Sequence, residues 1–200
     1  MAGDPPGDSN RVYEAIGEKV YSDLADLERV IKGCRRCPGG GSGLAGHGEP
    51  GSGLFLLAGR PGPGSAPGNP WGSRGEAVLE RLGWYGDSSH GGIYFSTALR
   101  CPLDDVSAAE LRRCAGYLAE ELFLIGPRLV MVSGKLAVVT LRAALGEGIP
   151  GQPKAGDSCS LFFSRFLFNV DVGRIDTEGG AAKVFWNVFS KALEMLEQPS

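Results

Sequence analysis

Apolar residues follow two alternating patterns along most of the chain. Short, nearly continuous apolar runs are typical of strands buried on both faces of a sheet, and apolar residues recurring every three or four positions are typical of helices buried on one face. The expected strands are LFLLAG (54–59), IYFSTAL (93–99), RLVMVSG (128–134) and LFFSRFLFNV (161–170). The expected helices cover residues 12–31, 74–83, 107–125, 135–145 and 177–196. This alternation predicts an α/β fold, a three-layer α/β/α sandwich with a mostly parallel four-stranded central sheet.

The carboxyl ends of the expected strands are the place to look for chemistry, because ligands of open parallel sheets bind there. The loops concerned follow Gly59, Leu99, Gly134 and Val170.

Two segments lack either pattern. Residues 1–10 are rich in Pro, Gly and Asp and are predicted to be disordered, which leaves 11–198 as a single domain. Residues 38–53 form a glycine-rich loop with little tendency to order itself.

Composition narrows the class of protein. The 200 residues are 42% hydrophobic, enough for one core, and no run approaches the roughly 20 apolar residues needed to cross a bilayer. We therefore expect a cytoplasmic protein, monomeric and without a membrane partner. The formal net charge of −3 argues against coating nucleic acid by bulk electrostatics, but a local basic patch stays open. Its candidates are Arg35, Arg36, Arg60, Arg74, Arg100, Arg112 and Arg113.

Cysteines supply the most specific chemistry. Cys34 and Cys37 end the first expected helix, Cys101 follows the second strand and Cys114 lies in the next helix. An odd total of five makes a disulfide framework the weakest interpretation, behind a redox pair or a metal site. Ser107, a plausible N-cap with Glu110 three residues on, allows the chain to fold back between the last two cysteines.

Four thiolates can hold zinc or an iron-sulfur cluster. The spacing C-x2-C, 63 residues, C-x12-C is wider than the compact zinc pattern and favours a cluster. The alternative is that Cys114 is a small buried hydrophobe, and Cys159 has no partner by any pattern and is expected to be inert.

These motifs together resemble the family 4 uracil-DNA glycosylases, the iron-sulfur branch of the uracil-DNA glycosylase superfamily. The resemblance covers residues 12–145 and rests on the four cysteines, LAGRPG (57–62), GNPW (68–71), IYFSTALRC (93–101) and PRLVMVSGKLA (127–137). It implies the uracil-DNA glycosylase fold and a 4Fe-4S cluster on Cys34, Cys37, Cys101 and Cys114. It also implies hydrolysis of the N-glycosidic bond of uracil or another deaminated base during DNA repair, with DNA as the partner.

The resemblance further implies that the substrate is bound by Gly59, Arg60, Pro61, Gly62, Trp71 and Thr97. Three of these depart from the family. Arg60 stands in place of a glutamate, Thr97 in place of the base-reading asparagine, and Trp71 in place of the phenylalanine that stacks on the base. Trp71 keeps an aromatic platform, whereas Thr97 lacks the paired donor and acceptor of an amide.

The last loop departs most. FNVDVGRID (168–176) contains no histidine where the family has one, and the only two histidines, His47 and His90, lie in other loops. Asn169 is a candidate donor to the leaving base, and Asp171 a candidate to orient water or balance charge on the sugar. The alternative, which we favour, is a polar strand end with a helix cap. A catalytically inactive relative that binds nucleic acid or a protein therefore stays open as a second function.

Overall fold

The computed structural model describes residues 24–37, 41–48, 51–82, 92–103, 105–175 and 179–197. Residues 1–10, the first half of the expected helix 12–31 and His90 lie outside them. The described strands are β1 (Leu54–Ala58), β2 (Ile93–Thr97), β3 (Leu129–Ser133), β4 (Ser158–Leu161) and β5 (Ser164–Asn169). The helices are α2 (Leu24–Lys32), α3 (Ser73–Leu82), α4 (Ala108–Ile125), α5 (Lys135–Leu145), the 3-10 turn η2 (Val172–Arg174) and α6 (Ala181–Glu197).

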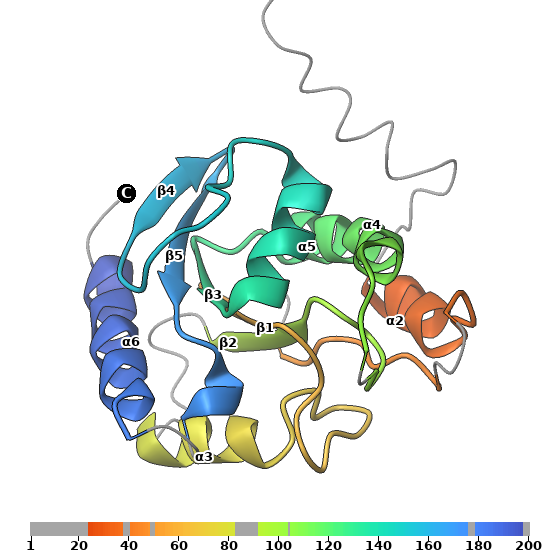
Figure 1. The fold of residues 1–200 in the computed structure, drawn as a ribbon, viewed down its shortest axis with the longest axis horizontal. Coiled ribbons are helices and arrows are strands. Elements are labelled where there is room, and N and C mark those ends of the chain that lie inside the picture. The colour runs from red at the N-terminus through yellow and green to blue at the C-terminus, as the bar shows by residue number, and fades with distance from the viewer. Residues whose placement is uncertain are drawn as a thin grey trace, which may run out of the picture.

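The strands form one sheet in the order β2-β1-β3-β5-β4 (Figure 1). β2, β1, β3 and β5 are parallel, and their last residues Thr97, Ala58, Ser133 and Asn169 are in register at one edge. The mostly parallel α/β sheet is confirmed. Its carboxyl edge gathers the loops that follow β1, β2, β3 and β5.

The expected number of four strands is wrong. Residues 158–169 form a hairpin, in which β4 pairs antiparallel with β5 and Leu161 faces Ser164, so the expected strand 161–170 begins with the end of β4 and the turn. The turn consists of Phe162 and Phe163, whose side chains are 53% and 63% exposed, and Phe162 has a φ of 54°. Two phenylalanines give no turn signal in a sequence, because tight turns usually carry Gly, Asn or Asp.

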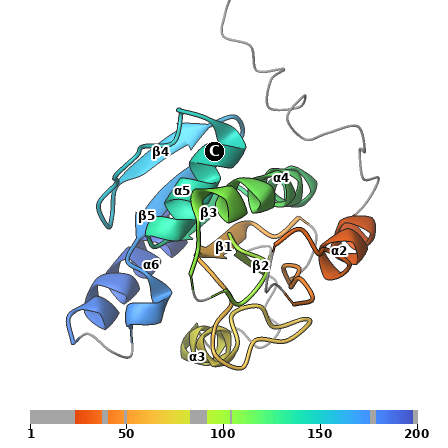
Figure 2. The same cartoon turned by 45° about the vertical axis from the view of Figure 1, so that its right-hand side comes forward.

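Helices cover both faces of the sheet, as the two views in Figures 1 and 2 show. α3 and α6 pack on one face through Val78, Phe185 and Phe189, against Leu56 and Met131 of the sheet. α4 and α5 pack on the other face through a second core that includes Leu118, Leu122 and Leu141. Alternate strand residues enter opposite cores, which explains the continuous apolar runs.

Local signals fix the helix ends. Ser107 caps α4 in a capping box with Glu110, and Gly126 ends it with a φ of 60° in the left-handed region. The expected helices at 107–125 and 135–145 are confirmed, as are those at 74–83 and 177–196 within a few residues.

The described part of the glycine-rich loop, residues 41–48, is ordered against the sheet. His47 forms a β-bridge with Phe95, and Leu44 and Ala45 are buried. A Cβ on Gly43 would lie 2.2 Å from the Ile31 carbonyl oxygen, and one on Gly46 would lie 2.4 Å from the Tyr94 ring. The expectation of little order is wrong here, because these glycines serve close packing.

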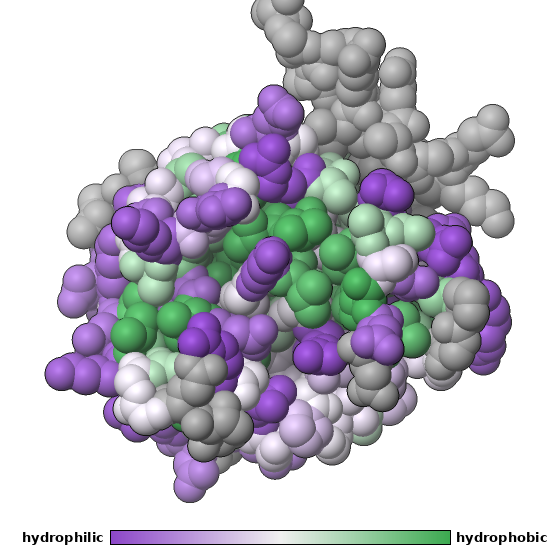
Figure 3. Space-filling model, in the orientation of Figure 1, coloured by the Kyte–Doolittle hydropathy of each residue, from purple (hydrophilic) through white to green (hydrophobic). Residues whose placement is uncertain are grey.

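The surface carries mainly hydrophilic residues around its rim, with hydrophobic ones gathered over the region of α5 (Figure 3), where Val139 is 36% exposed. Among the described residues, the helices are all too short or too polar to span a bilayer.

Candidate functional site

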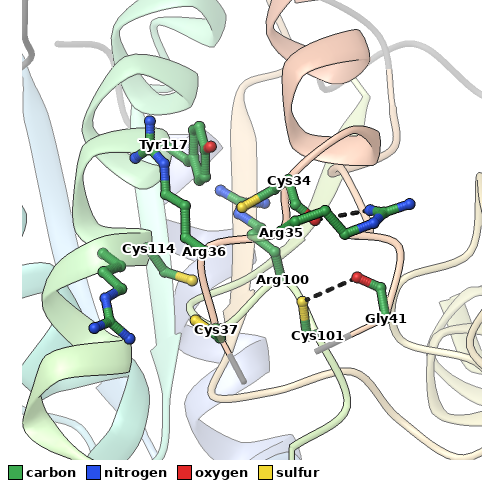
Figure 4. A pocket seen from close by; sticks show the side chains of 10 residues that line it. Cys34, Arg35, Arg36, Cys37, Gly41, Arg100, Cys101, Cys114 and Tyr117 are labelled. Carbon is green, nitrogen blue, oxygen red and sulfur yellow. Dashed lines mark hydrogen bonds between the residues drawn. The ribbon is translucent and has the colours of Figure 1, made fainter. Parts of the chain in front are cut away.

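Four cysteines from separate parts of the chain line one pocket, here called the sulfur pocket (Figure 4). Cys34 follows α2, where its backbone N–H bonds to the Ile31 carbonyl at 3.0 Å, and Cys37 lies three residues further on. Cys101 follows β2, and Cys114 lies in the second turn of α4. The fold therefore brings the C-x2-C pair and the C-x12-C pair together at one pocket.

The cysteines differ in exposure. Cys101 and Cys114 are buried, whereas Cys34 and Cys37 are half-buried. Burial raises the pKa of the Cys101 and Cys114 thiols, and the neighbouring cysteines add to the rise. The Arg100 charge and a hydrogen bond with the Arg100 backbone act in the opposite direction on the pKa of Cys114. Thiolates gathered here would need a cation to stabilise them.

Four cysteine sulfurs are suitable ligands for a zinc ion or an iron-sulfur cluster, but the sulfur pocket is narrow. It encloses about 10 Å³, room for one water molecule. Within the part of the chain that the structure describes, no group of three or more His, Cys, Asp or Glu side chains is placed to hold a metal ion. A single zinc ion would require all four sulfurs to close to about 2.3 Å from one point. An iron-sulfur cluster would be held by the same four cysteines, and the pocket would have to widen to admit it.

Cys159 lies apart from the other four, in β4 opposite Phe166. It packs partly buried against the core of the α4 and α5 face, and burial raises the pKa of its thiol.

One residue that lines the sulfur pocket, Arg100, belongs to a buried ion pair with Glu121. Arg100 and Glu121 are each 1% exposed, with Arg100 Nη2 at 2.8 Å from Glu121 Oε2. Glu121 also accepts hydrogen bonds from Tyr94, Ser96 and the Gly46 backbone. Arg100 is therefore not available to DNA phosphates, and its place in a surface basic patch was a wrong expectation. Arg112 and Arg113 beside Cys114 are exposed, as are Arg35 and Arg36.

A second site lies at the carboxyl edge of the sheet, where the loops after β1, β2 and β5 enclose a cavity of about 390 Å³, here called the arginine cavity. Three arginines and one aspartate line it. The full lining is Arg60, Pro61, Gly62, Pro63, Arg74, Pro102, Leu103, Asp171, Val172, Gly173 and Arg174. Arg60, Pro61, Gly62 and Asp171 were expected at such a site, and the predominance of positive charge suits an anionic ligand.

The glycine- and proline-rich loop that forms one wall is held in place by backbone contacts. A Cβ on Gly62 would lie 2.1 Å from the Trp71 carbonyl oxygen, and Gly72, with a φ of 58°, approaches the Pro63 carbonyl equally closely. Ala66 and Asn69 exchange backbone hydrogen bonds at 3.1 and 2.8 Å. These contacts hold the loop in one conformation, so it can serve as a rigid wall of the cavity, as positioning a substrate requires.

Three of the expected substrate-binding residues lie elsewhere. Trp71 is 1% exposed, packs edge-on against Phe95 and donates its indole N–H to the Ser96 carbonyl at 2.8 Å. Thr97 is fully buried, and its hydroxyl has no partner. Gly59 packs against Leu136 of α5. In this conformation Trp71 offers no face for stacking and Thr97 no edge for reading a base.

Asn169 and Asp171 take different roles. The Asn169 amide donates to the Phe185 carbonyl at 3.1 Å and accepts from the Val170 backbone at 2.8 Å, so it anchors α6 and is not free to donate to a base. Asp171 caps η2 by accepting from the Gly173 backbone at 2.8 Å. These are the structural roles favoured from the sequence. Asp171 nevertheless faces the arginine cavity and keeps Oδ2 beside Gly134.

An adjoining cavity of about 520 Å³ opens beside the carboxyl ends of β3 and β5. It shares Asp171 and Arg174 with the arginine cavity and adds Lys135 at the start of α5. The two cavities together extend along the carboxyl edge of the sheet.

Sequence reasoning missed Arg74 and Arg174 as site residues. A Cβ on Gly173 would come within 3.6 Å of both terminal nitrogens of Arg74, so this guanidinium lies between the η2 loop and the loop after β1. Its Nε is buried without a partner. The sequence marks Arg74 only as a basic residue, because Arg74 and Asp171 are far apart in the chain and nothing local indicates that both line one cavity.

The sequence matches no protein-family model, and no curated protein matches it significantly. Functional assignment therefore depends on the geometry of the two sites and on the motifs in the sequence.

Proposed function

We propose that this chain is a DNA glycosylase of the uracil-DNA glycosylase superfamily, which hydrolyses the N-glycosidic bond of uracil or another deaminated base. We further propose that Cys34, Cys37, Cys101 and Cys114 bind a structural 4Fe-4S cluster. A reducing cytoplasm, in which five free cysteines persist as thiols, is the location that fits this chemistry.

The observation that carries the proposal is that the two sites share a loop. Cys101 lines the sulfur pocket, and the next two residues, Pro102 and Leu103, line the arginine cavity. The Leu103 carbonyl in turn accepts a hydrogen bond from Arg60 at 3.4 Å. A cluster that holds Cys101 would therefore fix one wall of the cavity, which is a structural role and requires no redox step.

The arginine cavity supplies charges that base release needs. Cleavage passes through an oxocarbenium-like sugar and a departing anionic base, so the site must stabilise a positive and a negative charge. Arg74 and Arg60 line the cavity and supply positive charge for the departing base, while the loop 168–176 carries no histidine that could do so. The Asp171 carboxylate can face the sugar or orient water, because Gly173 occupies only one of its oxygens.

DNA contact would extend from the cavity toward the sulfur pocket. Arg35 and Arg36 are exposed beside the cysteines, and the Arg36 guanidinium lies 5.1 Å from the centre of the Tyr117 ring. With exposed Arg112 and Arg113 they form a local basic surface, suited to phosphates in spite of the net negative charge.

Base release is tested with single- and double-stranded oligonucleotides that contain uracil, hypoxanthine or xanthine, followed by alkali to cut abasic sites. We expect product from at least one base. Arg74→Gln should reduce the rate about 10²- to 10³-fold, the usual effect of removing one group that stabilises developing negative charge. Arg165→Gln, the same change at an exposed residue of β5, should leave the rate unchanged. If cluster-loaded protein releases no base from any of these substrates, the proposed glycosylase activity is refuted.

A second candidate is a catalytically inactive relative that binds nucleic acid or a protein. The burial of Trp71 and Thr97 favours it, because the two residues aligned with base recognition lie inside the core. DNA binding without base release on any substrate would support this candidate.

A further inference from the structure

Arg100 is buried with one donor left over. Its Nη1 bonds to the Ser96 hydroxyl at 2.8 Å and to Glu121 Oε1 at 3.1 Å, and its Nη2 bonds to Glu121 Oε2 at 2.8 Å. Its Nε is buried and has no hydrogen-bond partner. Leaving such a donor unsatisfied costs about 1–3 kcal/mol, so a missing acceptor is the natural explanation.

The place of Arg100 points to that acceptor. Arg100 lines the sulfur pocket and lies between Cys34 and Cys101 in the view of Figure 4. Glu121 and Ser96 hold the two terminal nitrogens, so the guanidinium cannot turn to find another partner. The pocket side offers the four cysteine sulfurs as acceptors, besides the Gly41 carbonyl oxygen, which lies 3.9 Å from the Cys101 sulfur.

Arg100 is also anchored through its backbone. Its carbonyl accepts from the Leu44 N–H at 2.7 Å, and Gly46 of the same loop donates to Glu121 at 3.0 Å. The buried pair is therefore fixed by β2, α4 and the loop 41–48 together. Such a pair is costly to bury, and stability alone is a poor reason to keep it.

We propose that Arg100 is a positioning residue for the cluster, whose Nε–H donates a hydrogen bond to a sulfur of the thiolate-bound group while its charge balances the thiolates. Glu121 acts through Arg100 by holding the guanidinium in place. This inference rests on the proposed cluster but not on glycosylase activity. Lysine would not replace arginine, because an ammonium cannot satisfy Glu121 and present a second fixed donor at once.

The test uses anaerobically purified full-length protein and two variants. Arg100→Lys keeps the positive charge and removes the guanidinium. The double change Arg100→Met with Glu121→Met leaves the net charge unaltered and replaces a buried pair by apolar side chains, an exchange that folded proteins often tolerate. Arg112→Met is the control, because Arg112 is exposed and lies outside the sulfur pocket.

Two readouts separate this role from a merely structural one: the reduction potential of the cluster and the rate at which a chelator removes iron. Loss of a hydrogen bond to sulfur lowers the potential. We expect a lower potential in both variants and iron loss about tenfold faster, the change that one charge-assisted hydrogen bond is worth. The Arg112→Met protein should match the wild type in both.

Unchanged potential and iron loss in folded, iron-containing variants would overturn the inference. Wild-type protein without iron would instead refute the proposed cluster. Should neither variant fold, ¹⁵N-arginine labelling of the wild type gives the answer, because a hydrogen-bonded Nε couples to the electron spin of a reduced cluster. Absence of a coupled arginine nitrogen would overturn the inference.

Discussion

Replacing Glu121 by glutamine should destabilise the fold severely. The carboxylate accepts hydrogen bonds from Gly46 at 3.0 Å, Tyr94 at 3.2 Å, the Ser96 hydroxyl, and Arg100 at 3.1 and 2.8 Å. Glutamine keeps the shape but leaves the Arg100 charge unpaired and turns an NH₂ group toward other donors. Breaking a buried pair in this way costs about 3–5 kcal/mol.

That loss is large against a typical free energy of unfolding of about 5–15 kcal/mol. With a urea slope of about 2 kcal/mol/M, the unfolding midpoint should fall by about 2 M. The assay is urea unfolding at pH 7 followed by far-UV circular dichroism. Glu147→Gln is the matched control, since Glu147 is 97% exposed and its carboxylate is no closer than 4.0 Å to Arg142. This change should alter the free energy of unfolding by less than about 0.5 kcal/mol.

The double variant that carries methionine at both Arg100 and Glu121 completes the comparison. It should recover most of the stability that Glu121→Gln loses, because it leaves no unpaired charge. A loss below about 1 kcal/mol for Glu121→Gln would refute the reasoning, since a pair that is 1% exposed on both sides has no water to replace the missing partner.

Three further predictions concern single positions. Burial, followed by repulsion from Glu121, raises the pKa of Tyr94 far above its ordinary value. The contribution of Tyr94 to the free energy of unfolding is therefore complete below about pH 10 and falls above that pH, where the tyrosine of the unfolded chain ionises. Urea unfolding at pH 8 to 11 should show that fall, with a smaller one in Tyr94→Phe; ionisation of Tyr94 near pH 10 in the native protein, seen at 295 nm, would contradict it. Gly62→Ala should displace the wall of the arginine cavity, because the new methyl would meet the Trp71 carbonyl at 2.1 Å, and reduce base release without removing iron; unchanged base release would show that the wall can shift. Ser107→Ala should cost about 1 kcal/mol in thermal unfolding by removing the cap of α4, and a cost near zero would mean that Glu110 holds the helix start alone.

The regular parts of the fold were predictable, because periodicity and caps are local. The capping box at Ser107 and the apolar runs of β1, β2 and β3 depend on neighbours in sequence. The hairpin at Phe162 was not predictable, since its two turn residues are phenylalanines and carry none of the usual turn signals.

The sites were predictable only in part. Cysteine spacing singled out the residues of the sulfur pocket, because a ligand set is recognised by residue type. The partner of Arg100 was hidden, since Glu121 lies in a helix pattern that gives no sign of a buried charge. Trp71 was misplaced because an aromatic in a glycine-rich loop suits a binding platform and a core anchor equally.

Iron and sulfide content of anaerobically purified protein tests the central claim most directly. The account predicts about four of each per chain and a broad visible absorbance, retained in Cys159→Ala and lost in Cys34→Ala. Protein that is folded but contains neither iron nor sulfide, or a Cys34→Ala variant with undiminished iron, would contradict it.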